Sequence, residues 1–425
     1  MKTREFKGMK SIKPPVKEFS ETNDILTFEE VGSQVHKFGA ALRKAGLTPA
    51  PDVATLDAMT TPCSLAIFEN TCKEWMIGAM GAFSQSLVVT TIYATLGNDA
   101  VVSAVQDGVI SAILCNKKDV KKVISRSSDM KTLKTIIYTH DCVAKNEEID
   151  FGIIPSGMKV ISFEEFVESG DVKAFPPTPP KPSSMAVLMY TSGSTGKPKG
   201  VVITHSQVTS CGAGLIVAGK INNKDVHLGY LPLAHIMELL AEISMIGVGG
   251  SICYADPKTL TAKGSYPLGA LEQFSPTIMI AVPKIWDVIK KGIEAKVAGS
   301  PPIAKFLVKT AFQWRTFAIN HGFDTPLFKA LVFKKFSKVV GGNLRLGLSG
   351  GGPLNNEVQI FIRTCFGIPF GQGYVSFFLI FSFASPLFVE HINYSPSTCI
   401  GFGLVHFIGF DRDKCWSNYA RPVGP

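Results

Sequence analysis

YTSGSTGKPKG occupies residues 190–200 and directly follows the apolar run MAVLM at residues 185–189. The stretch places three glycines, two lysines and several hydroxyl side chains within eleven residues. Glycine lets a backbone bend closely around a ligand, while N–H groups, hydroxyls and ammonium groups supply donors and positive charge. A strand that enters such a loop predicts a polyphosphate site in an α/β protein. A flexible Ser/Gly linker is the alternative interpretation.

The loop departs from the Walker A pattern G-x-x-x-x-G-K-[ST] at two positions. Thr191 stands where that pattern needs its first glycine, and Pro198 stands where it needs the magnesium-binding hydroxyl. The sequence therefore disfavours a GTPase or a mononucleotide kinase of the P-loop class.

Outward from the loop, apolar strand-like runs alternate with helix-length stretches, which is typical of a parallel sheet with covering helices. Upstream, the strand-like runs are SLAIF (64–68), LVVTTIY (87–93), SAILC (111–115), TIIYT (135–139) and KVISF (159–163), and TCKEWMIGAMGAF (71–83) is helix-like. Downstream, the same alternation continues through LGYLPL (228–233), the helix-like AHIMELLAEISMIG (234–247), TIMIAVP (277–283) and LRLGLSGG (344–351). The proline-rich FPPTPPKPSS at 175–184 can continue neither a helix nor a central strand and predicts a connector.

The first long helix is predicted to start after Thr27, because Glu30 completes a capping box and an apolar stripe follows. Gly46 is the expected stop. Residues 1–26 then form an N-terminal extension, whose opening MKTREFKGMK has no apolar segment behind its charges. We expect neither a secretory signal nor an initial membrane span there, and the folded part should meet the cytosol.

Composition restricts the function less than the motifs do. The 425 residues are 46% hydrophobic and 18% charged, which suits a large core, and the nine cysteines show no metal-ligand spacing. A net charge of +9 attracts nucleic acid, an anionic membrane surface or a polyphosphate substrate alike. No aromatic-interleaved basic motif accompanies the lysine clusters, so we expect no nucleic-acid partner.

YTSGSTGKPKG, followed by VVITH at 201–205, resembles the signature loop of the acyl- and aryl-adenylating superfamily. The wider match is to its long-chain acyl-CoA synthetase branch, which is similar at GYLPLAH (229–235) with Glu238 and Glu242, AVPKIWD (281–287), LSGGGPL (348–354) and GQGY (371–374). The resemblance implies an AMP-binding core over 27–374. Its fold would be the large N-terminal domain of an adenylate-forming ligase, with layered mixed and parallel sheets and covering helices, incomplete here because the small C-terminal domain is absent.

The resemblance implies ATP-dependent activation of long-chain fatty acids to acyl-CoA through an acyl-adenylate. ATP, Mg²⁺ and coenzyme A would take part, and charge neutralisation and positioning would carry the catalysis. Lys199, Thr191 and His235 would be catalytic. The nucleotide would be bound by Tyr190, Thr191, Ser192, Gly193, Ser194, Thr195, Gly196, Lys197, Lys199, Ser349, Gly350, Gly351, Gly352, Pro353, Gln372, Gly373 and Tyr374. No metal ligand is assigned.

Several of these residues also have a purely structural interpretation. His235 stands at the start of an apolar helical stretch, where a histidine is commonly a buried structural residue. The glycines from Gly350 could form a tight turn without a ligand, and Tyr374 could be an ordinary buried aromatic. The apolar residues after His235 could wall an acyl tunnel or simply pack the core.

The resemblance breaks after Tyr374, where the family continues to a threonine and a glutamate. Here the apolar run VSFFLIFSFASPLF begins at Val375, and family-like sequence returns only at RPVGP (421–425). We interpret 375–425 as an atypical apolar tail outside the family fold, in a chain expected to have little activity as written. A non-catalytic nucleotide- or acyl-binding fragment is the alternative function. We further expect peripheral association with the cytoplasmic face of an intracellular membrane such as the endoplasmic reticulum, or a cytosolic location.

Overall fold

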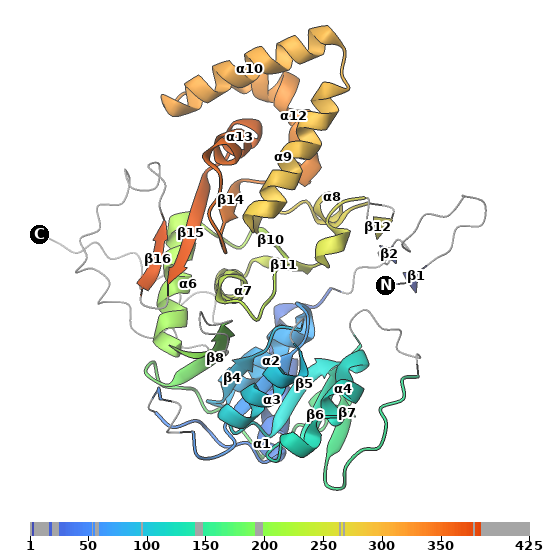
Figure 1. Cartoon of the computed structure of the whole chain (residues 1–425). Coiled ribbons are helices and arrows are strands. Elements are labelled where there is room, and N and C mark those ends of the chain that lie inside the picture. The colour runs from blue at the N-terminus through green and yellow to red at the C-terminus, as the bar shows by residue number, and fades with distance from the viewer. Residues whose placement is uncertain are drawn as a thin grey trace, which may run out of the picture. The chain divides into compact units, whose positions relative to one another are not determined.

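The computed structural model describes residues 25–52, 54–55, 59–94, 97–140, 148–191, 199–262, 265–266, 268–376 and 379–383, together with short strands at 2–3 and 17–18. Contacts divide the chain into residues 1–392 and 393–425, and all described residues belong to the first unit. Two large sheets with covering helices form its framework, so the predicted α/β class is confirmed (Figure 1).

Helix α1 (Phe28–Lys44) begins as the sequence predicts. The Thr27 hydroxyl accepts from the Glu30 N–H at 3.2 Å, and the Glu30 carboxylate accepts from the Thr27 N–H at 2.7 Å, which completes the capping box. Past the end of the helix, Gly46 has a φ of +95°, a backbone conformation that side chains other than glycine rarely adopt. The helix packs on α2 (Lys73–Ser84) through the facing glycines Gly39 and Gly81.

The first sheet has seven strands in the order β7-β6-β5-β3-β4-β8-β9. Its strands are β3 (Ser64–Phe68), β4 (Val88–Thr91), β5 (Ala112–Asn116), β6 (Thr135–Thr139), β7 (Lys159–Ser162), β8 (Met185–Thr191) and β9 (Lys199–Thr204). All neighbours pair in parallel except β9, which runs antiparallel to β8. The upstream runs therefore form the strands predicted for them, and residues 175–184 form a connector without helix or strand.

The two faces of this sheet belong to different cores. In β3, Leu65 and Ile67 pack with α1, α2 and α5 (Phe163–Glu168), while Ala66 and Phe68 pack with α3 (Asn98–Asp107) and α4 (Val120–Ile124). Both faces of a parallel sheet are covered, which explains why its strands read as continuous apolar runs.

The second sheet has six strands in the order β11-β10-β13-β14-β15-β16. Its strands are β10 (Val226–Gly229), β11 (Ser251–Tyr254), β13 (Ile278–Ala281), β14 (Leu346–Ser349), β15 (Phe370–Ser376) and β16 (Leu379–Phe383). The first five are parallel, and β16 pairs antiparallel with β15. Of the predicted tail 375–425, residues 375–376 end β15 and residues 379–383 form β16. Residues 384–425 lie outside the described residues, so a tail separate from the family fold stays a prediction.

Helices surround the second sheet. They are α6 (His205–Gly219), α7 (Ile236–Val248), α8 (Ala270–Phe274), α9 (Pro283–Ala298), α10 (Pro302–Asn320), α11 (Pro326–Phe328), α12 (Lys334–Ser337) and α13 (Asn356–Phe366), with a π-helical turn at Lys329–Phe333. A small third sheet joins β1 (Lys2–Thr3), β2 (Lys17–Glu18) and β12 (Ser265–Tyr266). Across the described residues, no helix combines the length and apolar character needed to cross a bilayer.

Candidate functional site

The β8–β9 hairpin holds the base of the predicted phosphate loop. Thr191 ends β8, Lys199 begins β9, and the two residues are direct partners in the antiparallel register. The backbone therefore brings both predicted catalytic positions to one point. The loop residues between them, Ser192, Gly193, Ser194, Thr195, Gly196, Lys197 and Pro198, lie outside the described residues, and their phosphate contacts stay predictions.

Tyr190 packs against the β8–β9 hairpin. Its ring is buried and lies next to Gly200, where an added Cβ would meet the ring carbon Cε1 at 3.6 Å. Its hydroxyl donates to the Asp107 carboxylate at 3.3 Å, and burial raises the pKa of Tyr190. The side chain is thus fixed between Asp107 and Gly200 at the base of the hairpin, while the predicted cofactor contact of Tyr190 stays a prediction.

The glycine turn at Ser349–Pro353 follows strand β14 directly. The Gly350 N–H donates to the Ala281 carbonyl at 3.2 Å, and Gly351 has a φ of +78° that favours glycine. Ser349 is 1% exposed, and its hydroxyl has no hydrogen-bond partner among the described residues. A buried, unpaired hydroxyl beside an exposed glycine backbone suits a polar ligand at this strand end.

The GQGY segment lies on the neighbouring strand. Gln372 is the register partner of Ser349, and its amide donates to Gln359 on α13 at 2.8 Å. The Gly373 carbonyl oxygen lies 3.4 Å from where a Gly350 Cβ would be. Tyr374 follows in β15, but its side chain is outside the described part of the structure. The structure thus brings the two predicted purine-side segments together.

His235 caps helix α7. Its Nδ1 accepts a hydrogen bond from the Met237 N–H at 3.1 Å, and burial lowers the pKa of His235. The imidazole therefore has a structural task in addition to the predicted catalytic one, which stays a prediction. Most of the apolar residues behind it, including Leu239 and Leu240, pack in a buried core, so core packing accounts for them.

The two sheets meet where these segments end. The Thr91 hydroxyl at the end of β4 donates to the Ala234 carbonyl at 3.2 Å, and the Leu233 N–H donates to the Thr71 hydroxyl at 2.9 Å. Strand β8, which carries the phosphate hairpin, runs beside β4 in parallel. Three predicted parts of the site follow the carboxyl ends of parallel strands: the base of the phosphate loop, His235 and the glycine turn. In open α/β sheets, ligands bind at this edge.

Met237 connects α7 to the glycine turn. A Cβ at Gly350 would lie 2.2 Å from the Met237 sulfur, so the two residues are in tight contact. We therefore expect Gly350→Ala to displace Met237 or the turn, and to weaken AMP and ATP binding about tenfold or more. Equilibrium binding to the purified chain measures this.

The Met237→Ala substitution supplies the control for that experiment. Because it removes the clashing sulfur, the double variant should regain most of the affinity lost by Gly350→Ala. An unchanged affinity in Gly350→Ala would contradict the assignment of the turn to the nucleotide.

A buried acid cluster lies behind α7, and sequence reasoning assigned it no role. His227 Nε2 lies 3.0 Å from the Glu238 carboxylate, and the Tyr254 hydroxyl donates to Glu242 at 2.7 Å. Both glutamates are 0% exposed, and both crowd Gly229, where a Cβ would lie 2.8 Å from a Glu242 oxygen. Burial raises the pKa of Glu238, against the opposing effect of His227. The spacing of the glutamates, one helical turn apart on an apolar helix, was the available signal.

Burial, reinforced by the charge of Glu238, raises the pKa of Glu242 well above its ordinary value of 4.5. The folded chain therefore keeps this proton while the unfolded chain releases it, so stability from Glu242 is lost as pH rises toward the folded pKa. Glu242→Gln does not titrate. We expect its unfolding free energy relative to the wild type to increase between about pH 5 and about pH 8. Urea denaturation at both values measures this.

The exposed Glu272→Gln variant serves as the control, because it makes the same chemical substitution at a side chain that is exposed in the folded protein. If the unfolding free energies of the wild type and Glu242→Gln differ by the same amount at both pH values, Glu242 is ionised in the folded protein.

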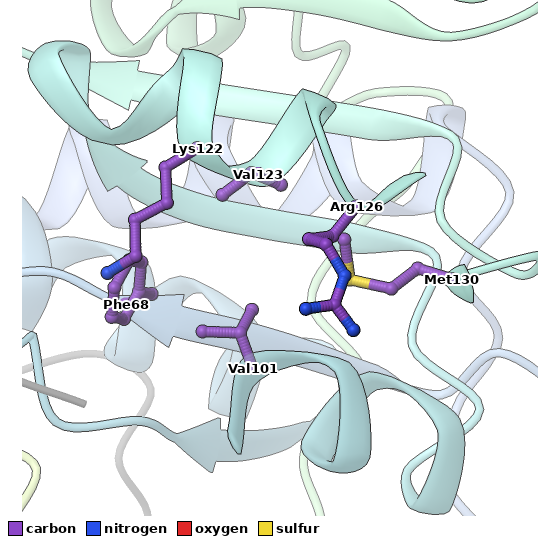
Figure 2. A pocket seen from close by; sticks show the side chains of 6 residues that line it. All are labelled: Phe68, Val101, Lys122, Val123, Arg126 and Met130. Atoms are coloured by element: carbon purple, nitrogen blue, oxygen red, sulfur yellow. The ribbon is translucent and has the colours of Figure 1, made fainter. Parts of the chain in front are cut away.

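A separate small pocket opens between β3, α3 and α4. Figure 2 shows its lining, which consists of Phe68, Val101, Lys122, Val123, Arg126 and Met130. Lys122 lies 4.7 Å from the centre of the Phe68 ring, and Arg126 pairs with Asp99 and Asp129 at 2.8 Å each. Both cations already have partners, so we assign the pocket no ligand.

Fold and site together define the large domain of an adenylate-forming enzyme: two α/β sheets, a glycine-hydroxyl hairpin and a glycine turn at their carboxyl edges. The family model described as "AMP-binding enzyme" matches residues 13–375, and the chain belongs to this family.

Two curated relatives carry the name that the sequence motifs predict. Long chain acyl-CoA synthetase 8 of Arabidopsis thaliana is 39% identical over 73% of this chain and 44% of its own length. Long-chain-fatty-acid--CoA ligase 2 of Schizosaccharomyces pombe is 33% identical over 72% of this chain and 45% of its own. The resemblance to the long-chain branch is confirmed, and the chain spans less than half of either relative.

Solved structures share the fold. A long-chain-fatty-acid-CoA ligase from Archaeoglobus fulgidus has a TM-score of 0.61 at 14% identity, covering 88% of this chain and 62% of that one. The A domain of a carboxylic acid reductase from Segniliparus rugosus, in complex with AMP and a carboxylic acid, has a TM-score of 0.58 at 15% identity, covering 83% and 53%. The predicted fold of an adenylate-forming domain is therefore confirmed.

Proposed function

We propose that this chain forms the nucleotide-binding part of an enzyme that activates long-chain fatty acids to acyl-CoA through an acyl-adenylate. The observation that carries the proposal is the convergence of the Thr191–Lys199 hairpin base, the His235 cap and the Ser349–Pro353 turn on one edge of two joined sheets. The names of the curated relatives support the substrate class.

The arrangement suits a reaction between two anions. A fatty carboxylate attacks the α-phosphate of ATP, the bond to the β-phosphate breaks, and pyrophosphate leaves. Coenzyme A then displaces AMP from the acyl-adenylate through its thiol. No protein nucleophile is needed, so the residues act by binding and by neutralising charge.

Each segment has a part in that positioning. The hairpin residues from Thr191 to Lys199 would hold the β- and γ-phosphates. Backbone at Gly351 and Gly352 would face the purine, and the unpaired Ser349 hydroxyl would donate or accept at the same edge. His235, held by its hydrogen bond to Met237, would line the junction between nucleotide and acyl group.

Mg²⁺ would neutralise charge on the phosphates of ATP. Among the described residues, no cluster of three histidine, cysteine or acidic side chains could hold a metal ion. We therefore name no ligand for the ion among these residues.

ATP–pyrophosphate exchange tests the proposal, since label enters ATP only when adenylate formation is reversible. We expect exchange that depends on palmitate, in this chain or in a version continued with the C-terminal half of a curated relative. ATP binding without palmitate-dependent exchange in both versions would refute the activity. That outcome would favour a non-catalytic nucleotide- or acyl-binding role.

We also propose that the protein works at the cytoplasmic face of an intracellular membrane such as the endoplasmic reticulum, with small molecules as its substrates. A long acyl chain partitions into lipid, which favours such a location. Fractionation of cells that express the tagged chain tests it, because recovery solely in the soluble fraction would contradict membrane association.

A further inference from the structure

Helix α10 carries a stripe of exposed apolar side chains, which consists of Ile303, Phe306, Leu307, Trp314 and Phe317. At 3.6 residues per turn these five positions fall within an arc of about 100°, the width of the apolar face that a helix normally buries. Phe306 is 72% exposed and Trp314 is 60% exposed. We call this set the α10 stripe.

The α10 stripe is distinct from the side of the helix that faces the protein. Ala311, Arg315 and Ala318 are buried, and Val308 and Phe312 pack against the core. The helix contacts α9 and α13, and Figure 1 shows it at the top of the view, above α13. The buried face of α10 is thus sufficient to pack the helix on the protein, and the exposed apolar stripe needs another explanation.

The chain around α10 concentrates exposed apolar residues. Phe323, Leu327 and Leu331, just after the helix, are each at least 67% exposed. With the stripe they make eight of the sixteen large exposed apolar residues found in the described part of the chain. Isolated exposed leucines are ordinary, but half of the set within 29 residues marks an interaction surface.

The same region is strongly basic. Residues 300–340 contain six lysines and one arginine against the single acid Asp324, a net charge of +6 within a chain of net +9. On α10 itself, Lys305 and Lys309 lie on the same side of the stripe on the helical projection, about 100° and about 60° beyond its edge, and both are exposed. Within the described ranges, no carboxylate forms an ion pair with either lysine.

We propose that the α10 stripe lies in the interface of an anionic lipid bilayer, with Lys305 and Lys309 on the headgroups. Exposed aromatic and aliphatic side chains beside lysines define an interfacial helix, and anionic headgroups complement the charge. A second copy of this chain would instead bring together two regions that each carry six exposed lysines against the single acid Asp324. The inference rests on the membrane location proposed above and names the surface that would serve it, and vesicle binding and adenylation can fail independently.

Vesicle flotation of the full chain tests the proposal. We expect binding to vesicles of phosphatidylcholine with phosphatidylserine, and weaker binding to phosphatidylcholine alone. Phe306→Ser combined with Phe317→Ser should reduce partitioning by at least about tenfold, because two large apolar side chains no longer enter the bilayer. Lys305→Gln with Lys309→Gln should reduce binding only where phosphatidylserine is present, and the binding should weaken with salt.

The matched control is Ile153→Ser with Ile154→Ser, which removes two exposed isoleucines elsewhere and should leave binding unchanged. Circular dichroism confirms that each variant is folded. Brominated lipids provide a local readout in a Trp416→Phe background, because Trp75 and Trp286 are fully buried, Trp314 is exposed, and the fourth tryptophan, Trp416, lies outside the described residues. Quenching of tryptophan fluorescence on vesicle binding should be lost in Trp314→Phe.

Three outcomes would overturn the proposal. The first is no binding to anionic vesicles. The second is unchanged binding in the Phe306→Ser/Phe317→Ser variant or unchanged quenching in Trp314→Phe, which would assign the contact to another segment. The third is a wild-type dimer in sedimentation that this double substitution dissociates while lipid binding stays unchanged, which would make the stripe a contact between copies.

Discussion

Replacing Trp286 by alanine should lower the free energy of unfolding by about 3–5 kcal/mol, the usual loss when a buried tryptophan leaves a cavity. Trp286 is fully buried, its indole N–H donates to the Leu348 carbonyl at 3.2 Å, and its ring packs edge-on against Phe370 with centroids 4.9 Å apart. One side chain from α9 thus fastens both β14 and β15. Urea denaturation followed by circular dichroism measures the change.

Trp314→Ala is the matched control, because the same residue type on the neighbouring helix is 60% exposed. Its loss should change stability by no more than about 0.5 kcal/mol. The loss of unfolding free energy in Trp286→Phe should lie between those of the two alanine variants. Phenylalanine keeps a ring against Phe370 but leaves the Leu348 carbonyl without its indole donor. Equal destabilisation by Trp286→Ala and Trp314→Ala would contradict the role of Trp286.

Trp286 connects the stability of the fold to the geometry of the candidate nucleotide site. Leu348, which accepts its hydrogen bond, is followed directly by Ser349 and the glycine turn. The cavity left behind β14 by Trp286→Ala would let that turn move relative to Gln372 on β15. We infer that Trp286 contributes to nucleotide binding only through this support, since it is fully buried.

Local signals predicted the framework because they depend on neighbouring residues. Thr27 and Glu30 specify a helix start by a contact three residues apart, and continuous apolar runs such as SLAIF specify strands covered on both faces. The proline-rich connector and the strand before the phosphate loop were predictable for the same reason. Strand order was not, because the pairing of β8 with β4 joins residues about a hundred positions apart.

The sequence motifs identified the residues of the site but could not predict which of them contact one another. The motif positions Gly350 and Gln372 were identified from the sequence, but the packing of Met237 on Gly350 and the hydrogen bond from Thr91 to Ala234 depend on the approach of distant segments. The buried cluster of Glu238 and Glu242 was visible only as two acids in an apolar helix. The α10 stripe was hidden because its spacing equals that of a core-facing helix.

The loop itself provides the sharpest functional test. Lys199→Ala should weaken ATP binding about ten- to a hundredfold, because a hydrogen bond from an ammonium group to a phosphate contributes about 1.5–3 kcal/mol. AMP lacks the β- and γ-phosphates, so its affinity should not change. In the version continued with the C-terminal half of a curated relative, the adenylation rate should fall by about 10²–10³, the usual loss when one charge-stabilising donor is removed.

The contrast with Gly350→Ala separates the two halves of the nucleotide site. That variant should weaken AMP and ATP alike, since the glycine turn is assigned to the purine side, whereas Lys199→Ala should discriminate between them. Lys224→Ala, at an exposed turn before β10, controls for loss of one positive charge. Equal binding of ATP by Lys199→Ala and wild type, with exchange of pyrophosphate intact, would remove the phosphate role from the hairpin and with it the basis for adenylate chemistry in this chain.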